Sequence, residues 1–386
     1  MTTGLQSDLH LAVRQKCVQD ALTLSAENIA QVLREIVPIM PQSERLQIVE
    51  EVLLAFDGMG PLADLLLLPN LTDIVVNSYQ EVWIDCGSGL QKVDCTWSDE
   101  TALRNFAIRL AGLAHRRLDD AVPWVDARLP NGLRMHAVIP PLSVGGTTIS
   151  LRVPALETIT LERLVELGSI TQDGATLLRQ IVRSGVSFVV SGGTGSGKTT
   201  VLNAMLAHVP IDKRILVIED STELSISHPH VVSLASRPAN IEGAGEVTMR
   251  TLVRQALRMR PDRLIVGEVR GVEVADLLTA FNTGHEGGAV TIHANSAHTV
   301  PARFEALGFM AGLSREAIHA QLVGGVQAVI ELGRLNSGQR AVRSVNVFQQ
   351  DDSGRATVIP AIDFCTGVSS QPGYEILQHH LEPQWS

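Results

Sequence analysis

Residues 191–200, Ser-Gly-Gly-Thr-Gly-Ser-Gly-Lys-Thr-Thr, have the types and the spacing that bind nucleotide phosphates. They fit the pattern G-x-x-x-x-G-K-[ST] at each fixed position, and the apolar run before them, residues 186–190, supplies the required strand. Glycine lets the backbone curl until its N–H groups converge on phosphate oxygens, at the positive end of the next helix. The sequence therefore predicts a P-loop with nine nucleotide contacts: Gly192, Gly193, Thr194, Gly195, Ser196, Gly197, Lys198, Thr199 and Thr200.

Two residues of this loop carry specific chemistry. Lys198 is expected to reach the β- and γ-phosphates, and the hydroxyl of Thr199 is expected to ligate Mg²⁺. A glycine-rich turn with a chance lysine is the structural alternative. The preceding strand and the helical composition of residues 200–206 favour the nucleotide site.

A P-loop enzyme also needs carboxylates, one to hold Mg²⁺ and one to orient the attacking water. The apolar run 264–267 ends at Glu268, and the run 215–218 leads into an acidic segment that ends at Glu223. Parallel strands deliver side chains toward a nucleotide at their carboxyl ends. Glu223 and Glu268 are therefore candidate catalytic residues, with Thr199 and Glu268 as the metal ligands, although solvated loop carboxylates are the alternative.

Two histidines flank one predicted strand, residues 288–293. A lone histidine is usually packed or capping, but His285 and His293 together, at the sheet edge where a γ-phosphate would lie, are candidate phosphate sensors. Their spacing does not match a zinc site.

Arginines fall into two groups. Three recur every four residues on one predicted helix and form either a solvated stripe or a subunit contact: Arg250, Arg254 and Arg258. Three more lie on predicted strands of the preceding domain: Arg128, Arg134 and Arg152. An arginine that reaches a γ-phosphate from a neighbouring domain or subunit can couple hydrolysis to motion.

The elements that must position these side chains alternate between strand and helix beyond residue 160, which predicts a parallel α/β sheet and an α/β P-loop NTPase fold. The predicted organisation is a small helical N-terminal appendage (1–57), an α+β N-terminal domain (58–153), a linker (154–159), the P-loop domain (160–334) and a β-rich tail (335–386). The tail is expected to form a small sheet of its own.

Composition limits the function classes. The chain has 386 residues, 45% of them hydrophobic, and a formal net charge of −10, which argues against wholesale nucleic-acid binding. The four cysteines lack the spacing of a zinc site or a disulfide framework, which suits packed thiols in a reducing cytoplasm. No apolar run approaches 18 residues, so we expect a soluble cytoplasmic protein that meets a membrane only through a partner.

Four motifs, in order, make the chain similar to the type II/IV secretion ATPase superfamily: the P-loop and residues 218–224, 258–271 and 283–295. Residues 125–132 and 149–152 resemble the N-terminal domain of that family, so the resemblance runs from about residue 58 to residue 332. Within the superfamily, the chain resembles the tight-adherence (Tad) pilus-assembly ATPases.

This resemblance implies a RecA-like C-terminal core and a cytoplasmic homo-hexamer at the cytoplasmic face of the inner membrane. The hexamer would dock on a platform protein and use ATP and Mg²⁺ to drive pilus assembly or secretion. By the same resemblance, Glu223 positions water, Glu268 serves Mg²⁺, His285 and His293 form the histidine box, and Arg134 and Arg152 reach phosphates. The four-cysteine zinc module of the extension-motor branch is absent from the sequence, which disfavours that branch.

Two other functions are consistent with the same core. One is a nucleic-acid-dependent P-loop motor for DNA transfer or uptake, against which the acidic net charge counts. The other is a nucleotide switch or scaffold without hydrolysis, against which the presence of both Glu223 and Glu268 counts.

Overall fold

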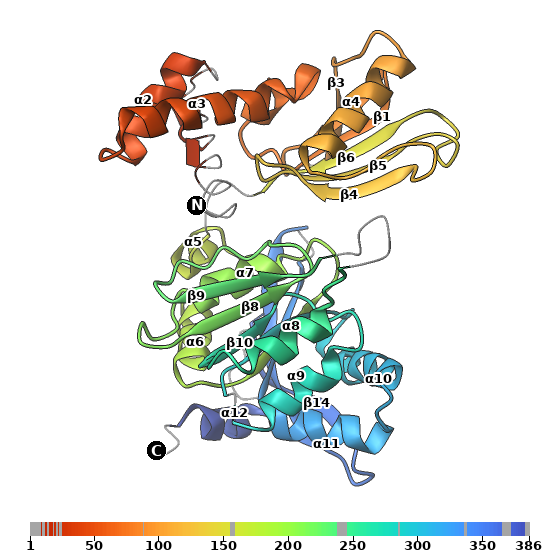
Figure 1. The fold of residues 1–386 in the computed structure, drawn as a ribbon. Helices are drawn as coiled ribbons and strands as arrows, with labels where there is room; N and C mark the ends of the chain where they lie inside the picture. Colours follow the sequence, from red (N-terminus) through yellow and green to blue (C-terminus); the bar gives the residue numbers. More distant parts are fainter. Residues whose placement is uncertain are drawn as a thin grey trace. The chain divides into compact units, whose positions relative to one another are not determined.

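The computed structural model divides the chain into two compact units, Met1–Glu157 and Thr158–Ser386 (Figure 1). It describes residues 9–382 except 10, 11, 14, 18, 21, 23, 24, 88, 155–158, 238–244, 285, 336, 337 and 365–371; the side chains at 43, 47, 51 and 54–57 are also outside the description. The division between the units falls within the segment 154–159 that the sequence predicts as a linker.

The first unit contains a six-stranded antiparallel sheet in the order β3-β2-β1-β6-β5-β4, with helix α4 across one face (Figure 1). Asp99 begins α4, because its side chain accepts a hydrogen bond from the Ala102 N–H. The element bounds are α2 Ala26–Ile36, α3 Gln42–Asp57, β1 Asp73–Ser78, β2 Glu81–Asp85, β3 Leu90–Val93, α4 Glu100–Leu113, β4 Trp124–Arg128, β5 Arg134–Val138 and β6 Thr148–Arg152, with short 3-10 turns at Gly60–Leu62 and Leu65–Leu67.

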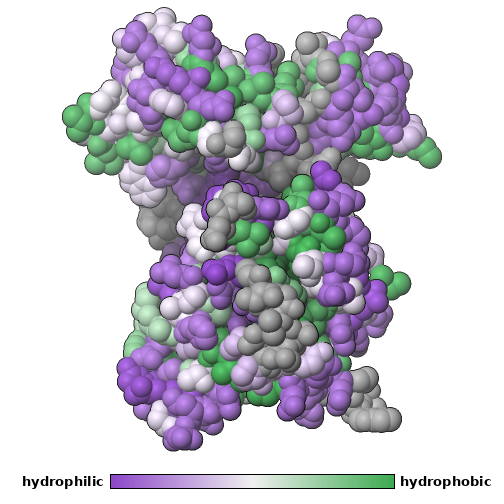
Figure 2. Space-filling model, turned by 180° about the vertical axis from the view of Figure 1, so that it is seen from behind, coloured by the Kyte–Doolittle hydropathy of each residue, from purple (hydrophilic) through white to green (hydrophobic). Residues whose placement is uncertain are grey.

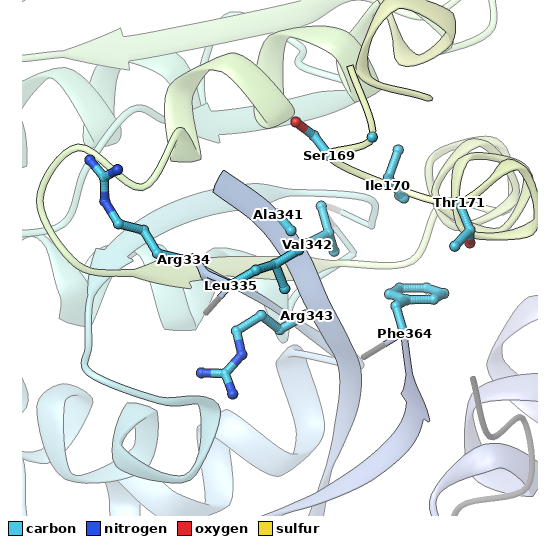
Figure 3. Close-up of a pocket in the computed structure, with 10 residues that line it drawn as sticks. Ser169, Ile170, Thr171, Arg334, Leu335, Ala341, Val342, Arg343 and Phe364 are labelled. Carbon is cyan, nitrogen blue, oxygen red and sulfur yellow. The ribbon is translucent and has the colours of Figure 1, made fainter. Parts of the chain in front are cut away.

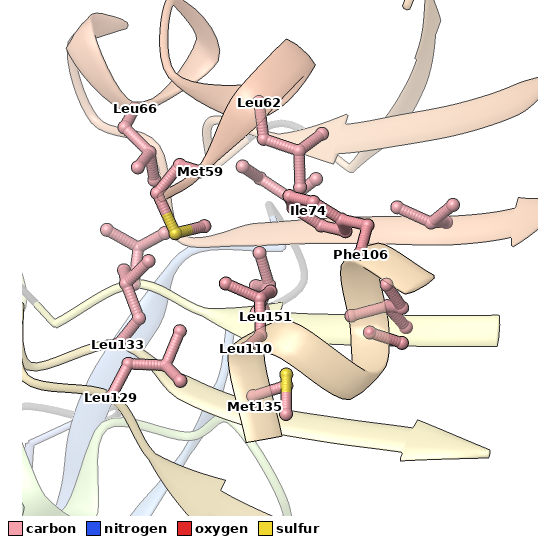
Figure 4. Close-up of a cluster of buried hydrophobic side chains, with 14 of the residues drawn as sticks. Met59, Leu62, Leu66, Ile74, Phe106, Leu110, Leu129, Leu133, Met135 and Leu151 are labelled. Carbon is pink, nitrogen blue, oxygen red and sulfur yellow. The ribbon is translucent and has the colours of Figure 1, made fainter. Parts of the chain in front are cut away.

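One hydrophobic core holds this first unit together (Figure 4). Phe106 and Leu110 of α4 meet Ile74 of β1 and Leu151 of β6, and the 3-10 turns add Leu62 to the same cluster. Buried residues of α2, among them Ile29 and Leu33, belong to this cluster as well. The helices before residue 58 therefore share the core of the sheet domain that follows them.

The second unit is an eight-stranded sheet in the order β14-β13-β12-β7-β11-β10-β8-β9, in which β7 to β12 run parallel. Its central strands are buried on both faces, which explains their continuous apolar runs. Buried residues of α5, α6, α7 and α12 share one hydrophobic cluster, and buried residues of α8 to α11 share the other.

The bounds in the second unit are as follows. The helices are α5 Leu161–Glu166, α6 Gln172–Arg183, α7 Lys198–Leu206, α8 Met249–Ala256, α9 Val274–Phe281, α10 Val300–Met310, α11 Arg315–Gly325 and α12 Tyr374–Leu381, with a 3-10 turn at Ala297–Thr299. The strands are β7 Phe188–Gly192, β8 Ile215–Glu219, β9 Val231–Ala235, β10 Arg263–Val266, β11 Ala289–His293, β12 Ala328–Arg334, β13 Arg340–Gln350 and β14 Ala356–Asp363.

The expectation of a separate small sheet after residue 335 is wrong. Strand β13 pairs antiparallel with β12, which lies directly beside the P-loop strand β7, and β14 completes the same sheet. Val342, Val345 and Val347 of β13 are buried in the same core as Phe188 of β7. The apolar residues of the tail therefore extend the P-loop core, and turn-rich composition alone did not reveal this.

The surface is mixed in character. On the face that Figure 2 shows, hydrophilic residues surround smaller hydrophobic patches. Within the part of the chain that the structure describes, no helix is both long enough and apolar enough to cross a lipid bilayer.

Candidate nucleotide site

The P-loop joins the central strand β7 to helix α7. Gly195 and Gly197 have φ angles of +67° and +95°, a left-handed conformation that favours glycine. A Cβ atom added to Gly193 or Gly195 would meet no atom within 4 Å, so open space lies over the loop where phosphates would bind. The hydroxyl of Ser196 is buried and has no hydrogen-bond partner among the described residues, which leaves a donor for a phosphate oxygen.

The ammonium group of Lys198 occupies the loop. It donates to the carbonyl oxygens of Gly192 and Gly193, each at 3.0 Å, and to His293 Nδ1 at 3.3 Å. Because burial disfavours its charge, the pKa of Lys198 is lowered, although the carboxylates of Glu268 and Glu223 oppose that shift.

The contact with Lys198 fixes the protonation of His293. A lysine ammonium has donors only, so His293 Nδ1 accepts, and the ring is the neutral tautomer that carries its proton on Nε2. Nε2 donates that proton to Glu268 Oε1, and the two atoms lie 3.0 Å apart. Burial, followed by the nearby charge of Lys198, lowers the pKa of His293, which agrees with a neutral ring.

The contacts continue beyond Glu268. Arg270 donates to Glu268 Oε2 at 2.6 Å, and its other terminal nitrogen lies 4.0 Å from Asp220 Oδ2. We call Lys198, His293, Glu268, Arg270 and Asp220 the charged chain. It crosses the carboxyl ends of β7, β11, β10 and β8.

Strand register explains why these residues meet. His293 pairs with Gly192, and Val266 pairs with both Val290 and Ile218, so the parallel strands end at one edge. Thr291 ties two of these ends together, because its hydroxyl donates to the Gly267 carbonyl oxygen at 2.6 Å.

Glu219 is a residue of the site for which the sequence assigned no role. It is the last residue of β8, its side chain is buried, and its Oε1 accepts the backbone N–H groups of Glu223 and Leu224, each at 3.0 Å. Glu219 therefore holds the backbone of the loop that presents the exposed Glu223. Its position at the end of an apolar strand was the available signal.

Gly267 makes room for that buried carboxylate. A Cβ at position 267 would lie 2.7 Å from Glu219 Cγ, closer than real Cβ atoms come to a neighbour. We expect Gly267→Ala to displace Glu219 and to destabilise the second unit by about 1–3 kcal/mol, the usual cost of overpacking. The melting temperature should fall by about 2–10 °C, and ATP turnover should fall with it.

Thermal unfolding, followed by circular dichroism, checks this expectation. Gly112→Ala is the matched control, because the added Cβ meets nothing within 4 Å. Gly112 lies within helix α4, where alanine is more favourable than glycine. Equal melting temperatures for Gly267→Ala and the wild type would contradict the packing argument.

The contact of the other predicted loop residues with nucleotide stays a prediction. Thr199 and Thr200 are half-buried in the first turn of α7, and Thr194 is exposed. Thr199 follows the P-loop at the start of α7, and Glu268 follows the end of β10. Their role as metal ligands stays a prediction.

Arg134 and Arg152 belong to the first unit and face each other across β5 and β6. Arg128 pairs with Arg134 in the same row, and all three alternate with the residues that α4 buries, so they lie on the opposite face of the sheet. Arg134 also forms an ion pair with Asp126 at 3.3 Å. Their contact with phosphates stays a prediction.

His285 lies outside the described residues. Its role as a phosphate sensor stays a prediction.

The arginine stripe on α8 is more than a solvated face. Arg250 and Arg254 both donate to Asp276 of α9, at 2.7 and 2.8 Å. Two of the three arginines predicted on one helix therefore join α8 to α9, while Arg258 lies just beyond the end of α8 and donates to the Arg254 carbonyl oxygen at 3.1 Å.

A hollow in this unit, of about 530 Å³, is lined by residues such as Ser169, Arg334 and Phe364 (Figure 3). Its described lining includes no member of the charged chain. The nucleotide site is thus defined by its chemistry at the strand ends and not by this hollow.

A P-loop on the central strand of a largely parallel sheet, with a lysine, a histidine and carboxylates at the same edge, defines a RecA-like P-loop ATPase. The chain belongs to the type II/IV secretion system protein family, which matches residues 56–363. The match covers most of both units.

Relatives and a solved structure agree with this assignment. The chain is 49% identical over 308 residues to a putative conjugal transfer protein of Mycobacterium tuberculosis, covering 78% of this chain and 87% of that protein. It is 31% identical over 283 residues to the type IV secretion system protein VirB11 of Brucella suis, covering 67% of this chain and 78% of that protein. The X-ray structure of the Yersinia pseudotuberculosis ATPase DotB superposes with a TM-score of 0.52 at 17% identity, covering 82% of this chain and 81% of that one, which shows the shared fold.

Proposed function

We propose that this protein is a hexameric ATP-driven motor that powers assembly of, or secretion through, a Tad- or type IV-like pilus. The observation that carries the proposal is the continuous contact from Lys198 through His293 to Glu268, because it places a phosphate-binding cation beside a carboxylate at one sheet edge. A scaffold that only bound nucleotide would not need this second group.

The residues present fit ATP with Mg²⁺. The Ser196 hydroxyl, which has no hydrogen-bond partner in the described part of the chain, and the open space above Gly193 and Gly195 suit phosphate oxygens. The oxygen donors of Thr199 and Glu268 suit a hard cation such as Mg²⁺, which, when bound, would neutralise phosphate charge.

The residues of this protein have separable roles in the proposal. Lys198 exchanges its carbonyl partners for phosphate oxygens, and His293 keeps Glu268 oriented. Glu223 orients the attacking water from its loop, which Glu219 holds in place. Arg134 and Arg152 reach phosphates from the first unit, so that loss of phosphate releases that unit and produces movement.

The proposed working form is a homo-hexamer at the cytoplasmic face of the inner membrane, docked on a platform protein. The family match over residues 56–363 supports a secretion-system role, and the motif similarity to Tad ATPases supports the pilus branch.

DNA transfer is the second candidate function. It is favoured by the conjugal-transfer name of the Mycobacterium relative, whereas the net charge of −10 counts against a nucleic-acid track on this chain.

Two measurements test the proposal, and the second of them separates the two candidate functions. We expect light scattering to give the mass of a hexamer with Mg·ATP, and we expect turnover to rise with the cytoplasmic part of a platform protein while DNA leaves it unchanged. A strictly monomeric protein would contradict the motor. Turnover that DNA stimulates, with a steep salt dependence, would favour the second function.

A further inference from the structure

Both oxygens of Glu268 are occupied in this structure. His293 Nε2 lies 3.0 Å from Oε1, and Arg270 donates to Oε2 at 2.6 Å. Each oxygen keeps a second lone pair, but the positive guanidinium against Oε2 repels a divalent cation and competes with it for this carboxylate.

Arg270 is the donor that is able to leave. Its side chain is 53% exposed, and a second carboxylate, Asp220, already lies 4.0 Å from its guanidinium. The ring of His293, by contrast, is held from its other side by Lys198.

The backbone beneath Arg270 is fixed. Glu273, which is only 6% exposed, accepts the N–H groups of both Arg270 and Gly271 through its Oε1, each at 2.8 Å. A change of partner by Arg270 therefore needs rotation of its side chain alone.

The alternative partner is also held in place. The Ser236 hydroxyl donates to Asp220 Oδ1 at 3.2 Å, which leaves Oδ2 facing Arg270. An acceptor for the guanidinium is thus already formed beside the site.

We propose that Arg270 is a positioning residue with two partners: it covers Glu268 when no divalent cation is bound and moves to Asp220 when Glu268 engages the cation. This inference rests on the proposed metal role of Glu268. It predicts that Arg270 competes with the metal and so sets the cation concentration at which the site fills. Nucleotide that arrives without metal finds Glu268 still covered.

The test measures metal binding apart from turnover. Manganese binding to the protein·ADP complex is followed by the loss of the free Mn²⁺ EPR signal, and ADP affinity in EDTA is measured with a fluorescent ADP analogue. Since Arg270→Ala removes a competitor, we expect Mn²⁺ to bind about three- to tenfold more tightly, with ADP affinity in EDTA changed less than about twofold. Arg270→Lys, which keeps the charge, should stay close to the wild type.

Arg303→Ala is the matched control for loss of positive charge alone. Arg303 is exposed on α10, and its charge acts on the same histidine, whose pKa it helps to lower. We expect it to alter Mn²⁺ affinity less than Arg270→Ala does. Equal tightening by both variants would overturn the inference, because it would reduce the effect to general electrostatics.

A double-mutant cycle tests the second partner. Asp220→Asn should weaken Mn²⁺ binding in the wild-type background and have little effect in the Arg270→Ala background. Equal weakening in both backgrounds would make Asp220 a metal-site group and overturn its role as the partner of Arg270.

Failure of the inference and failure of the proposed metal role give different results. If Glu268→Gln leaves Mn²⁺ binding unchanged, the metal role of Glu268 is wrong, and the inference is overturned with it. If Glu268→Gln weakens binding but Arg270→Ala leaves it unchanged, only the inference is overturned.

Discussion

Lys198→Ala is expected to weaken ATP binding by a factor of about 100 or more and to reduce turnover to background. Lys198 is buried at the P-loop, and its three described hydrogen-bond partners are two loop carbonyl oxygens and a neutral histidine. None of them is an anion, so the ammonium is held ready for phosphates at little cost. Alanine removes the cation and leaves the loop glycines in place.

Titration with a fluorescent ATP analogue measures this effect. Lys213→Ala is the matched control, because Lys213 is a half-exposed lysine that pairs with Asp212 at 3.5 Å. Unchanged melting temperatures would show that both variants fold. ATP affinity within about threefold of the wild type for Lys198→Ala would contradict the assignment of the loop.

Glu223→Gln is expected to lower kcat by about 100-fold or more while ATP affinity changes less than about threefold. It is the backbone N–H of Glu223, and not its carboxylate, that Glu219 holds, so the isosteric amide keeps the loop in place. What it removes is the negative charge that orients water. We therefore expect the variant to accumulate as an ATP-bound assembly.

Single-turnover hydrolysis measures the loss of catalysis, and mass measurement with ATP detects the ATP-bound assembly. Glu375→Gln, an exposed glutamate in the first turn of α12, should behave as the wild type. If Glu223→Gln hydrolyses ATP normally, another residue orients the water. If it loses ATP affinity as Lys198→Ala does, Glu223 acts in binding and not in hydrolysis.

The sequence predicted the class of fold and the principal groups of the candidate site because each carries a local signal. A P-loop is contiguous, and an apolar run that ends in a carboxylate marks a strand end, as at Glu268. The RecA-like core is confirmed, and so is membership of the type II/IV secretion family.

The contacts between these groups could not be predicted in the same way. That His293 sits between Lys198 and Glu268 depends on the register of β11 with β7 and β10, which local pattern does not encode. Glu219 gave no signal beyond its place at the end of a strand, and its partners are backbone groups of its own loop. The tail was misjudged for a related reason, since turn residues mark where a hairpin lies but not the strand that it pairs with.

The place of β12 beside β7 also orders the events of biosynthesis. Phe188 pairs with Ala328, a residue that leaves the ribosome 140 positions later, and the carbonyl and side chain of Leu332 back Gly192. Contacts so distant in sequence form slowly, and a nascent chain folds from its amino end. The first unit can therefore fold while the P-loop strand β7 still lacks its neighbouring strand β12. The phosphate-binding loop, encoded mid-chain, is completed only when nearly all of the protein has been made.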